Sequence, residues 1–213
     1  MTTTPVAARV AEVRDRIAAA AARAGRDPEA ITLVAATKTV DVARVQQVVA
    51  AGVVDVGENR AQELLAKTAV HGARWHFLGQ LQRNKVRQLA PWVGCWQSVD
   101  RPELGAEIAR RAPGARVLVE VNVGEEPQKG GCAPAAVATL VDSLRADGLD
   151  VAGLMTVPPH GDDPRRWFAQ LREQAAALGL AELSMGMTDD FERAVEEGAT
   201  MVRVGRALFG ARP

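Results

Sequence analysis

The sequence predicts an α/β fold, a (β/α)8 TIM barrel with an extra N-terminal helix, and three observations support this prediction. Short apolar runs alternate with stretches whose apolar residues recur at helical spacing. About eight such runs follow one another at intervals of roughly twenty residues, the period of parallel βα units. The length of 213 residues just reaches the roughly 200 that a closed eight-unit barrel needs. An open, doubly wound parallel sheet is the alternative.

The elements can be placed in order along the chain. An N-terminal amphipathic helix is predicted from Val6 to Ala24, and Gly25 with Pro28 ends it. Short apolar runs predict the strands at residues 31–36, 53–56, 75–78, 94–99, 116–123, 149–154, 181–184 and 200–204. The helices between most of them begin at readable caps, among them Asp41, Asn59, Asp100 and Thr188.

Composition and charge exclude several classes of protein. The 26 Lys and Arg balance the 26 Asp and Glu, which argues against binding to nucleic acid or a membrane surface through a basic face. Two cysteines are too few for a disulfide scaffold, so we expect a reducing cytoplasm. The charged N-terminal segment does not read as a signal peptide, and no apolar run reaches the roughly 18 residues of a membrane span. We expect one domain over residues 1–213, a cytoplasmic monomer with no metal site.

Lys38 is the first candidate functional residue. It directly follows the apolar run of residues 31–37, so its ammonium would begin inside the mouth of the barrel. Burial there lowers the pKa of an amine and makes it a nucleophile toward aldehydes. The alternative is a lysine that reaches solvent or pairs with Glu58 or Asp100.

The last two strands supply a second signal, a candidate phosphate site. Ser184, Gly186 and Gly205 follow or end these strands, and Arg206 opens a short turn after the last one. In barrels of this kind, the loops after strands seven and eight commonly bind phosphate. The two sites would lie side by side, because the first and last strands are neighbours in a closed barrel.

These strand-end residues resemble a known family, the pyridoxal phosphate homeostasis proteins, single-domain relatives of the alanine racemase barrel. The matching segments run across nearly the whole chain, and they are 33–39 (LVAATKT), 57–63 (GENRAQE), 75–85 (WHFLGQLQRNK), 98–101 (SVDR), 121–130 (VNVGEEPQKG), 153–157 (GLMTV) and 183–210. The resemblance implies a (β/α)8 barrel that binds pyridoxal 5′-phosphate as a Schiff base on Lys38.

The resemblance also implies which other residues surround the cofactor. Ser184, Gly186 and Gly205 would hold the phosphate, and Arg203 would face the pyridine nitrogen. The residues that would line the ring pocket are Asn59, His76 and Met155. Where the family usually has threonine, this chain has Arg206, whose guanidinium either binds the phosphate or points to solvent.

Two functions follow from this resemblance. The first is a carrier that holds the cofactor on Lys38 for intracellular vitamin B6 homeostasis and passes it to apo-enzymes, with no catalytic turnover. A charged guanidinium beside the pyridine nitrogen disfavours the protonated, strongly electron-withdrawing ring, and the chain has no tyrosine to match the second base of the racemases. The alternative is an amino-acid racemase or related enzyme, with Cys132, His76 or Lys129 as the second base.

Overall fold

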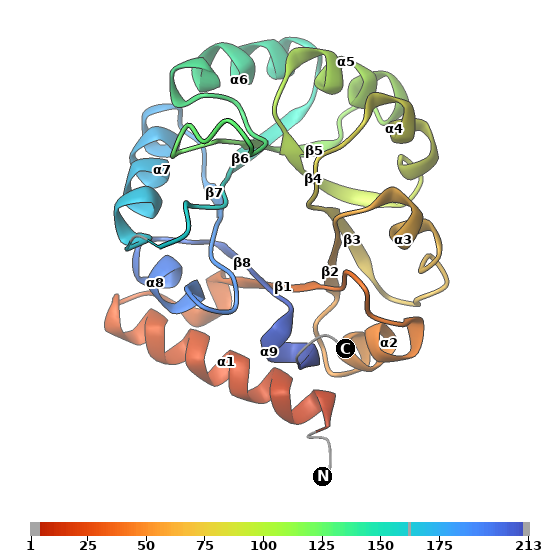
Figure 1. Ribbon diagram of the computed structural model, residues 1–213, viewed down its shortest axis with the longest axis vertical. Helices are drawn as coiled ribbons and strands as arrows, with labels where there is room; N and C mark the ends of the chain where they lie inside the picture. The colour runs from red at the N-terminus through yellow and green to blue at the C-terminus, as the bar shows by residue number, and fades with distance from the viewer. Residues whose placement is uncertain (1–4, 162, 211–213) are drawn as a thin grey trace.

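Eight parallel strands form a closed barrel in the order β1 to β8, and helices surround it (Figure 1). The structure, a computed structural model, describes residues 5–161 and 163–210. The strands are β1 (Thr32–Ala36), β2 (Asp55–Glu58), β3 (Arg74–Phe77), β4 (Val93–Val99), β5 (Arg116–Glu120), β6 (Asp150–Met155), β7 (Glu182–Ser184) and β8 (Met201–Val204). The predicted barrel is confirmed.

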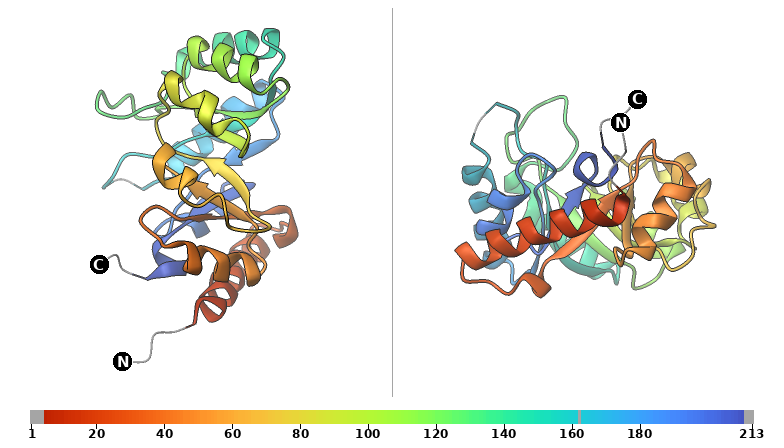
Figure 2. Two further views of the ribbon diagram at one scale, coloured as in Figure 1. Left: turned by 90° about the vertical axis from the view of Figure 1, so that its right-hand side faces the viewer. Right: turned by 90° about the horizontal axis from the view of Figure 1, so that it is seen from below.

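The helices follow the strands in alternation. They are α1 (Val6–Arg23), α2 (Val42–Ala50), α3 (Ala61–Leu65), α4 (Arg83–Leu89), α5 (Pro102–Arg111), α6 (Val137–Ala146), α7 (Arg165–Ala177), α8 (Phe191–Glu196) and α9 (Arg206–Phe209), with short 3₁₀ turns at Pro28–Ala30 and Pro134–Ala136. The predicted N-terminal helix is α1, which precedes the first strand and packs against α8 and α9 on the outside of the barrel (Figure 2).

The barrel closes because β1 pairs with β8. The two strands run parallel, with Thr32 opposite Met201 and Ala35 opposite Val204. An open doubly wound sheet would leave its outermost strands unpaired with each other, so that alternative is wrong. The closure brings the end of β1, where Lys38 follows, next to the ends of β7 and β8.

Every predicted strand differs from the observed one at one end or both, six of them by a single residue and two by more. The second begins at Asp55 instead of residue 53, because the Val53 amide donates to the Val48 carbonyl and so belongs to the turn that leaves α2. The fifth ends at Glu120 instead of residue 123, because Val121 makes only an isolated bridge to Cys132. Val53 and Val121 are buried although they lie outside the strands, so the apolar runs in the sequence extend past the strand ends.

The helix caps were predicted correctly only in part. Asp41 caps α2 by accepting a hydrogen bond from the Arg44 amide at 2.9 Å, as expected. Asn59, Asp100 and Thr188 cap no helix, because α3, α5 and α8 each begin one or two residues further along. Asn59 and Asp100 directly follow β2 and β4, and Thr188 lies in the loop after β7, so all three are on the face where a barrel carries its site.

The interior of the barrel is unusual in holding both apolar and polar side chains. A small apolar cluster consists of Val34, Cys95, Leu118, Met155 and Met201. Buried polar side chains lie beside it, and they are His76, Gln97, Ser184 and Arg203. Branched apolar residues usually fill such barrels. Burying polar groups costs free energy unless they are hydrogen-bonded. We therefore expect these four polar side chains to serve a function other than packing.

Two negative findings apply to the described residues. Among residues 5–161 and 163–210, no helix combines the length and apolar character needed to cross a membrane. The same part of the chain contains no cluster of three or more His, Cys, Asp or Glu side chains that could bind a metal ion.

Candidate functional site

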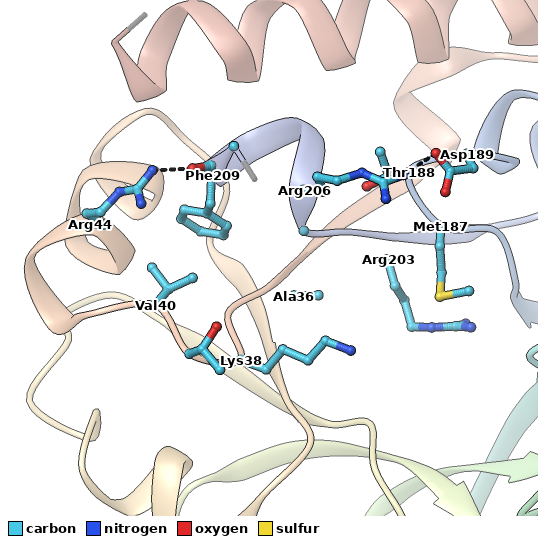
Figure 3. Close-up of a pocket in the computed structure, with 13 residues that line it drawn as sticks. Ala36, Lys38, Val40, Arg44, Met187, Thr188, Asp189, Arg203, Arg206 and Phe209 are labelled. Atoms are coloured by element: carbon cyan, nitrogen blue, oxygen red, sulfur yellow. Dashed lines mark hydrogen bonds and ion pairs between the residues drawn. The ribbon is translucent and has the colours of Figure 1, made fainter. Parts of the chain in front are cut away.

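A cavity opens at the C-terminal ends of β1 and β8, between the loops that follow β1, β7 and β8. Its lining includes Lys38, Thr188, Arg203, Gly205 and Arg206. Figure 3 shows Lys38 on one side of the cavity and Thr188 and Arg206 on the other. The half-buried Lys38 side chain extends into this cavity, toward the side on which Arg203 lies. An amine, a guanidinium and a hydroxyl thus share one space at the mouth of the barrel.

The backbone around Lys38 is fixed by a buried ion pair. The Glu58 carboxylate is fully buried, and its Oε1 accepts hydrogen bonds from Lys67 Nζ at 2.5 Å and from Thr37 Oγ1 at 2.6 Å. Lys67 Nζ also donates to the Thr37 carbonyl at 2.8 Å. The Glu58 carboxylate thus forms an ion pair with Lys67, a lysine that the sequence does not single out.

The next residue after Lys38 is held as well. The Thr39 amide donates to Glu63 Oε2 at 2.6 Å, and the same oxygen lies 3.6 Å from Lys67 Nζ. Thr39 has a φ of 64°, a left-handed conformation that a residue with a branched Cβ adopts only when its surroundings impose it. Glu58, Glu63 and Lys67 therefore set the direction in which Lys38 leaves β1.

Arg203 lies deep inside the barrel, and its two hydrogen bonds to described residues are with neutral groups. It is 5% exposed, and its Nη1 donates to Ser184 Oγ at 2.7 Å while its Nη2 donates to the Thr156 carbonyl at 2.8 Å. Burial lowers the pKa of Arg203 to about 10, so the guanidinium stays charged at neutral pH.

Ser184 and His76 lie below the cavity rather than in its lining. Ser184 is fully buried, and its hydroxyl donates to Gln97 Oε1 at 2.6 Å. Gln97 Nε2 lies 2.7 Å from His76 Nδ1, and His76 Nε2 lies 2.8 Å from the carboxylate of Asp55, the first residue of β2. These side chains connect Arg203 to the opposite end of the barrel.

The other predicted site residues lie at the ends of strands or just after them. Asn59 follows β2 and is half-buried, and Met155 ends β6 in the inner apolar cluster. Gly186, just after β7, has a φ of 89°, and a Cβ there would lie 2.5 Å from Ala194 Cβ, so the turn requires glycine. The structure thus brings Lys38, Arg203, Gly205 and Arg206 to one cavity, and the roles of Asn59, Met155 and Gly186 stay predictions.

Thr188 is a candidate that sequence reasoning missed. The sequence predicts a helix cap at this position, but the Thr188 side chain lines the cavity, and its Oγ1 accepts a hydrogen bond from the Ala207 amide at 3.4 Å. The cap position before α8 belongs to Asp190 instead. The signal that could have found Thr188 is its place in the loop after β7, where barrels commonly bind phosphate.

Arg206 lies at the outer edge of the cavity. Its guanidinium forms an ion pair with Asp189, and both side chains are largely exposed. An exposed pair of this kind contributes at most about 1 kcal/mol to stability. Arg206 is therefore held loosely, within reach of the cavity that it lines.

Glu120 is a second group that the sequence did not single out. It ends β5, and burial, assisted by the negative charge of Asp100, raises its pKa to about 7 although Arg203 acts in the opposite direction. Its Oε2 is buried and finds no hydrogen-bond partner among the described residues. Glu120 therefore changes its charge near neutral pH at the rim of the barrel.

We expect Glu120→Gln to stabilise the fold in a pH-dependent way. The folded state binds the Glu120 proton more tightly than the unfolded state does. The free energy of unfolding of the wild type therefore falls as pH rises from about 4.5 to about 7. The Glu120→Gln variant has no proton to lose at this position, so this group causes no such fall. The variant should gain about 1–3 kcal/mol at pH 8 and almost nothing at pH 4. Urea unfolding at both pH values measures this, with the exposed Glu173→Gln as control; equal stabilities at pH 8 would contradict the assignment.

Comparison with known proteins identifies the family. Residues 9–213 match the family model described as the alanine racemase N-terminal domain. The pyridoxal phosphate homeostasis protein of Pseudomonas aeruginosa is 41% identical, with 97% of this chain and 96% of that protein covered. The chain belongs to the pyridoxal phosphate homeostasis protein family. The Escherichia coli member is 35% identical, with 97% of each chain covered, and the resemblance seen in the sequence is thereby confirmed.

Solved structures agree with this family assignment. PipY of Synechococcus elongatus, solved with pyridoxal phosphate (PLP) bound, is 33% identical and superposes with a TM-score of 0.84, covering 96% of this chain and all of PipY (100%). Alanine racemase from Corynebacterium glutamicum is 17% identical with a TM-score of 0.72, and the matched part spans 94% of this chain and 61% of the racemase. The second likeness shows the shared barrel alone.

Proposed function

We propose that this chain binds pyridoxal 5′-phosphate as a Schiff base on Lys38 and acts in intracellular PLP homeostasis, holding the cofactor and supplying it to apo-enzymes. The observation that carries the proposal is the single cavity that contains the Lys38 amine and is bounded by Arg203 and the loops after β7 and β8. The names of the relatives and the PLP bound in PipY support it. We expect the protein to do this in the cytoplasm as a monomer.

The residues of the cavity fit the cofactor. Lys38 supplies the primary amine that an aldehyde needs, and Arg203 supplies N–H donors only, so it suits an unprotonated ring nitrogen. When bound, PLP supplies an aldehyde and an aromatic ring that withdraws electrons best when its nitrogen is protonated. The positive charge of Arg203, buried and held by Ser184 and Thr156, opposes that protonation.

The candidates for a second acid or base favour a carrier over an enzyme. A racemase of this architecture needs a second acid or base across the ring, and the chain contains no tyrosine. His76 is engaged with Asp55 and Gln97 below the cavity, and burial raises the pKa of the Cys132 thiol to about 11. Lys129 is paired with Glu126 and donates to the Pro158 carbonyl. We therefore propose storage and delivery without catalytic turnover.

We propose Thr188 and Gly205 as the centre of the phosphate site, with Gly186 shaping the preceding turn. The resemblance places Ser184 at the phosphate, but its hydroxyl donates a hydrogen bond to Gln97 and accepts one from Arg203. The guanidinium of Arg206, at the edge of the cavity, adds a positive charge where the family usually has a threonine hydroxyl. It would bind the phosphate by exchanging Asp189 for it.

We expect Thr188→Val to weaken the binding of PLP by roughly tenfold, the effect of one hydrogen bond to a charged group. Pyridoxal, which lacks the phosphate, should bind the variant and the wild type equally. Equilibrium titration followed by absorbance measures both affinities. An unchanged PLP affinity, or an equal loss for pyridoxal, would show that Thr188 does not bind the phosphate.

The proposed function is tested by loading the purified chain with PLP and removing free cofactor. We expect a Schiff-base absorbance band, and activation of an added apo-enzyme by the loaded chain as the band decays. The same loaded chain is incubated with single amino-acid enantiomers. Sustained racemisation or decarboxylation that is lost in Lys38→Ala would overturn the carrier in favour of the enzyme, and absence of the band would overturn both.

A further inference from the structure

A continuous line of buried hydrogen bonds crosses the interior of the barrel. It runs from Arg203 on β8 through Ser184 on β7, Gln97 on β4 and His76 on β3 to Asp55 on β2, with successive distances of 2.7, 2.6, 2.7 and 2.8 Å. Each of these side chains is less than 10% exposed. We refer to these five residues as the polar chain.

The polar chain has one direction. Asp55 is held ionised because, although burial raises its pKa, hydrogen bonds from His76 and Arg74 lower it by more. A carboxylate only accepts hydrogen bonds, so the proton on His76 is at Nε2, and Nδ1 accepts from the Gln97 amide group. Gln97 then presents its oxygen to Ser184, whose hydroxyl donates to it.

This direction determines what Ser184 can offer to Arg203. Because the Ser184 proton is committed to Gln97 Oε1, its oxygen lone pairs face Arg203 Nη1. A reversed Gln97 amide would place its oxygen against the lone pair of His76 Nδ1, which is unfavourable, and it would deprive the Ser184 hydroxyl of its acceptor Oε1. The orientation of Gln97, set by His76 and Asp55, thus fixes one of the two acceptors that hold the guanidinium.

We propose that Gln97 and His76 are positioning residues that aim Arg203 at the pyridine nitrogen of PLP. The inference rests on the proposed function, because it assumes that the cofactor lies above Arg203. Both guanidinium contacts of Arg203 are with uncharged oxygens, those of Ser184 and Thr156. The geometry of the guanidinium therefore depends on hydrogen-bond direction rather than on a salt bridge.

Simple packing does not explain the polar chain. A barrel interior can be filled with apolar side chains at no cost in unpaired polar groups, whereas a buried polar network stabilises a fold only when every member is satisfied. Here five strands each contribute one member of the polar chain, which ends at Arg203, a buried cation that lines the cavity. That is the arrangement expected of groups that orient a binding residue.

The test compares PLP with an analogue in which a carbon replaces the pyridine nitrogen. The analogue keeps the aldehyde and the phosphate but cannot accept a hydrogen bond from Arg203. We expect the wild type to bind PLP about tenfold or more tightly than the analogue, and Gln97→Met to reduce this preference to about threefold or less. The exposed Gln88→Met serves as the matched control and should keep the full preference.

A second variant separates positioning from folding. Ser184→Ala breaks the next link with a smaller change in volume, so it tests the inference if Gln97→Met does not fold. In Ser184→Ala the preference should fall, whereas a Ser184 that bound phosphate would weaken PLP and the analogue equally.

The outcomes distinguish this inference from the proposed function. A preference that is unchanged in both Gln97→Met and Ser184→Ala would overturn the positioning role. A wild type that forms the absorbance band with PLP and with the analogue at equal affinity would also overturn it, while leaving the proposed function in place. A wild type that binds neither compound would overturn the proposed function, and this inference with it.

Discussion

Lys67→Met is expected to lower the free energy of unfolding by about 3–5 kcal/mol, the usual cost of leaving one member of a buried ion pair without its partner. Lys67 is 6% exposed, and its Nζ contacts the Glu58 carboxylate at 2.5 Å and the Thr37 carbonyl at 2.8 Å. Without the ammonium, the fully buried Glu58 would keep only the hydroxyl of Thr37 as a side-chain donor. Urea unfolding at neutral pH measures the loss.

Two control variants show whether the loss of stability comes from the unpaired charge of the buried Glu58 carboxylate. In Lys67→Met with Glu58→Gln, the buried carboxylate is gone, so the double variant should recover part of the stability lost by the single one. Lys85→Met removes a lysine of α4 that belongs to no such cluster among the contacts described here and should change stability by less than about 0.5 kcal/mol. A Lys67→Met chain within about 1 kcal/mol of the wild type would contradict the assigned role.

Lys38→Ala is expected to abolish retention of PLP completely. The amine that forms the covalent link would be absent, and the phosphate and ring contacts alone exchange freely with solvent. After incubation with PLP and removal of free cofactor, the variant should show no Schiff-base absorbance, while Lys85→Ala should match the wild type. Lys38→Arg is a stricter control, because it keeps the positive charge in the cavity but offers no primary amine.

The Lys38 variants also separate covalent capture from electrostatic attraction. If Lys38→Arg retained the band, another amine would form the link. If Lys38→Ala folded with the stability of the wild type and still activated an apo-enzyme after loading, delivery would not depend on Lys38. Either result would contradict the proposed function.

The barrel itself was predictable from the sequence because its strands are parallel and covered on both sides. Each strand therefore reads as a short apolar run, and the runs recur at the spacing of βα units. The placement of Lys38, Arg203 and Gly205 on one cavity follows from the same pattern, since the ends of neighbouring strands meet at one face once β1 pairs with β8. Only the ends of individual strands and caps were wrong.

The polar chain could not be predicted in this way. Which side chains of a strand point into a barrel depends on the register of each pair, and β3–β4 and β4–β5 shift register beside His76 and near Gln97. A bulge changes the face on which the following residues lie. The resemblance placed His76 and Ser184 near the cofactor, but their hydrogen bonds to Gln97 depend on these shifts.

The buried ion pair of Lys67 with Glu58 was missed for a related reason. Lys67 lies in the turn after α3, far from any strand end, and its amine reaches back to Thr37 and Glu58. The only signal in the sequence is the spacing of Glu63 and Lys67, which are four residues apart and suit an ion pair on one helix face. That spacing is common on exposed helices and does not indicate a buried partner.

The central claim, that Lys38 forms the covalent link to the cofactor, is tested most directly by borohydride reduction of the PLP-loaded wild type and mass mapping of the adduct. Reduction fixes the linkage at the amine that carries it, and the chain offers only four lysines, at positions 38, 67, 85 and 129. We expect the phosphopyridoxyl mass on the peptide that contains Lys38, at one adduct per chain. An adduct on Lys129 or another lysine, with Lys38 unmodified, would contradict it.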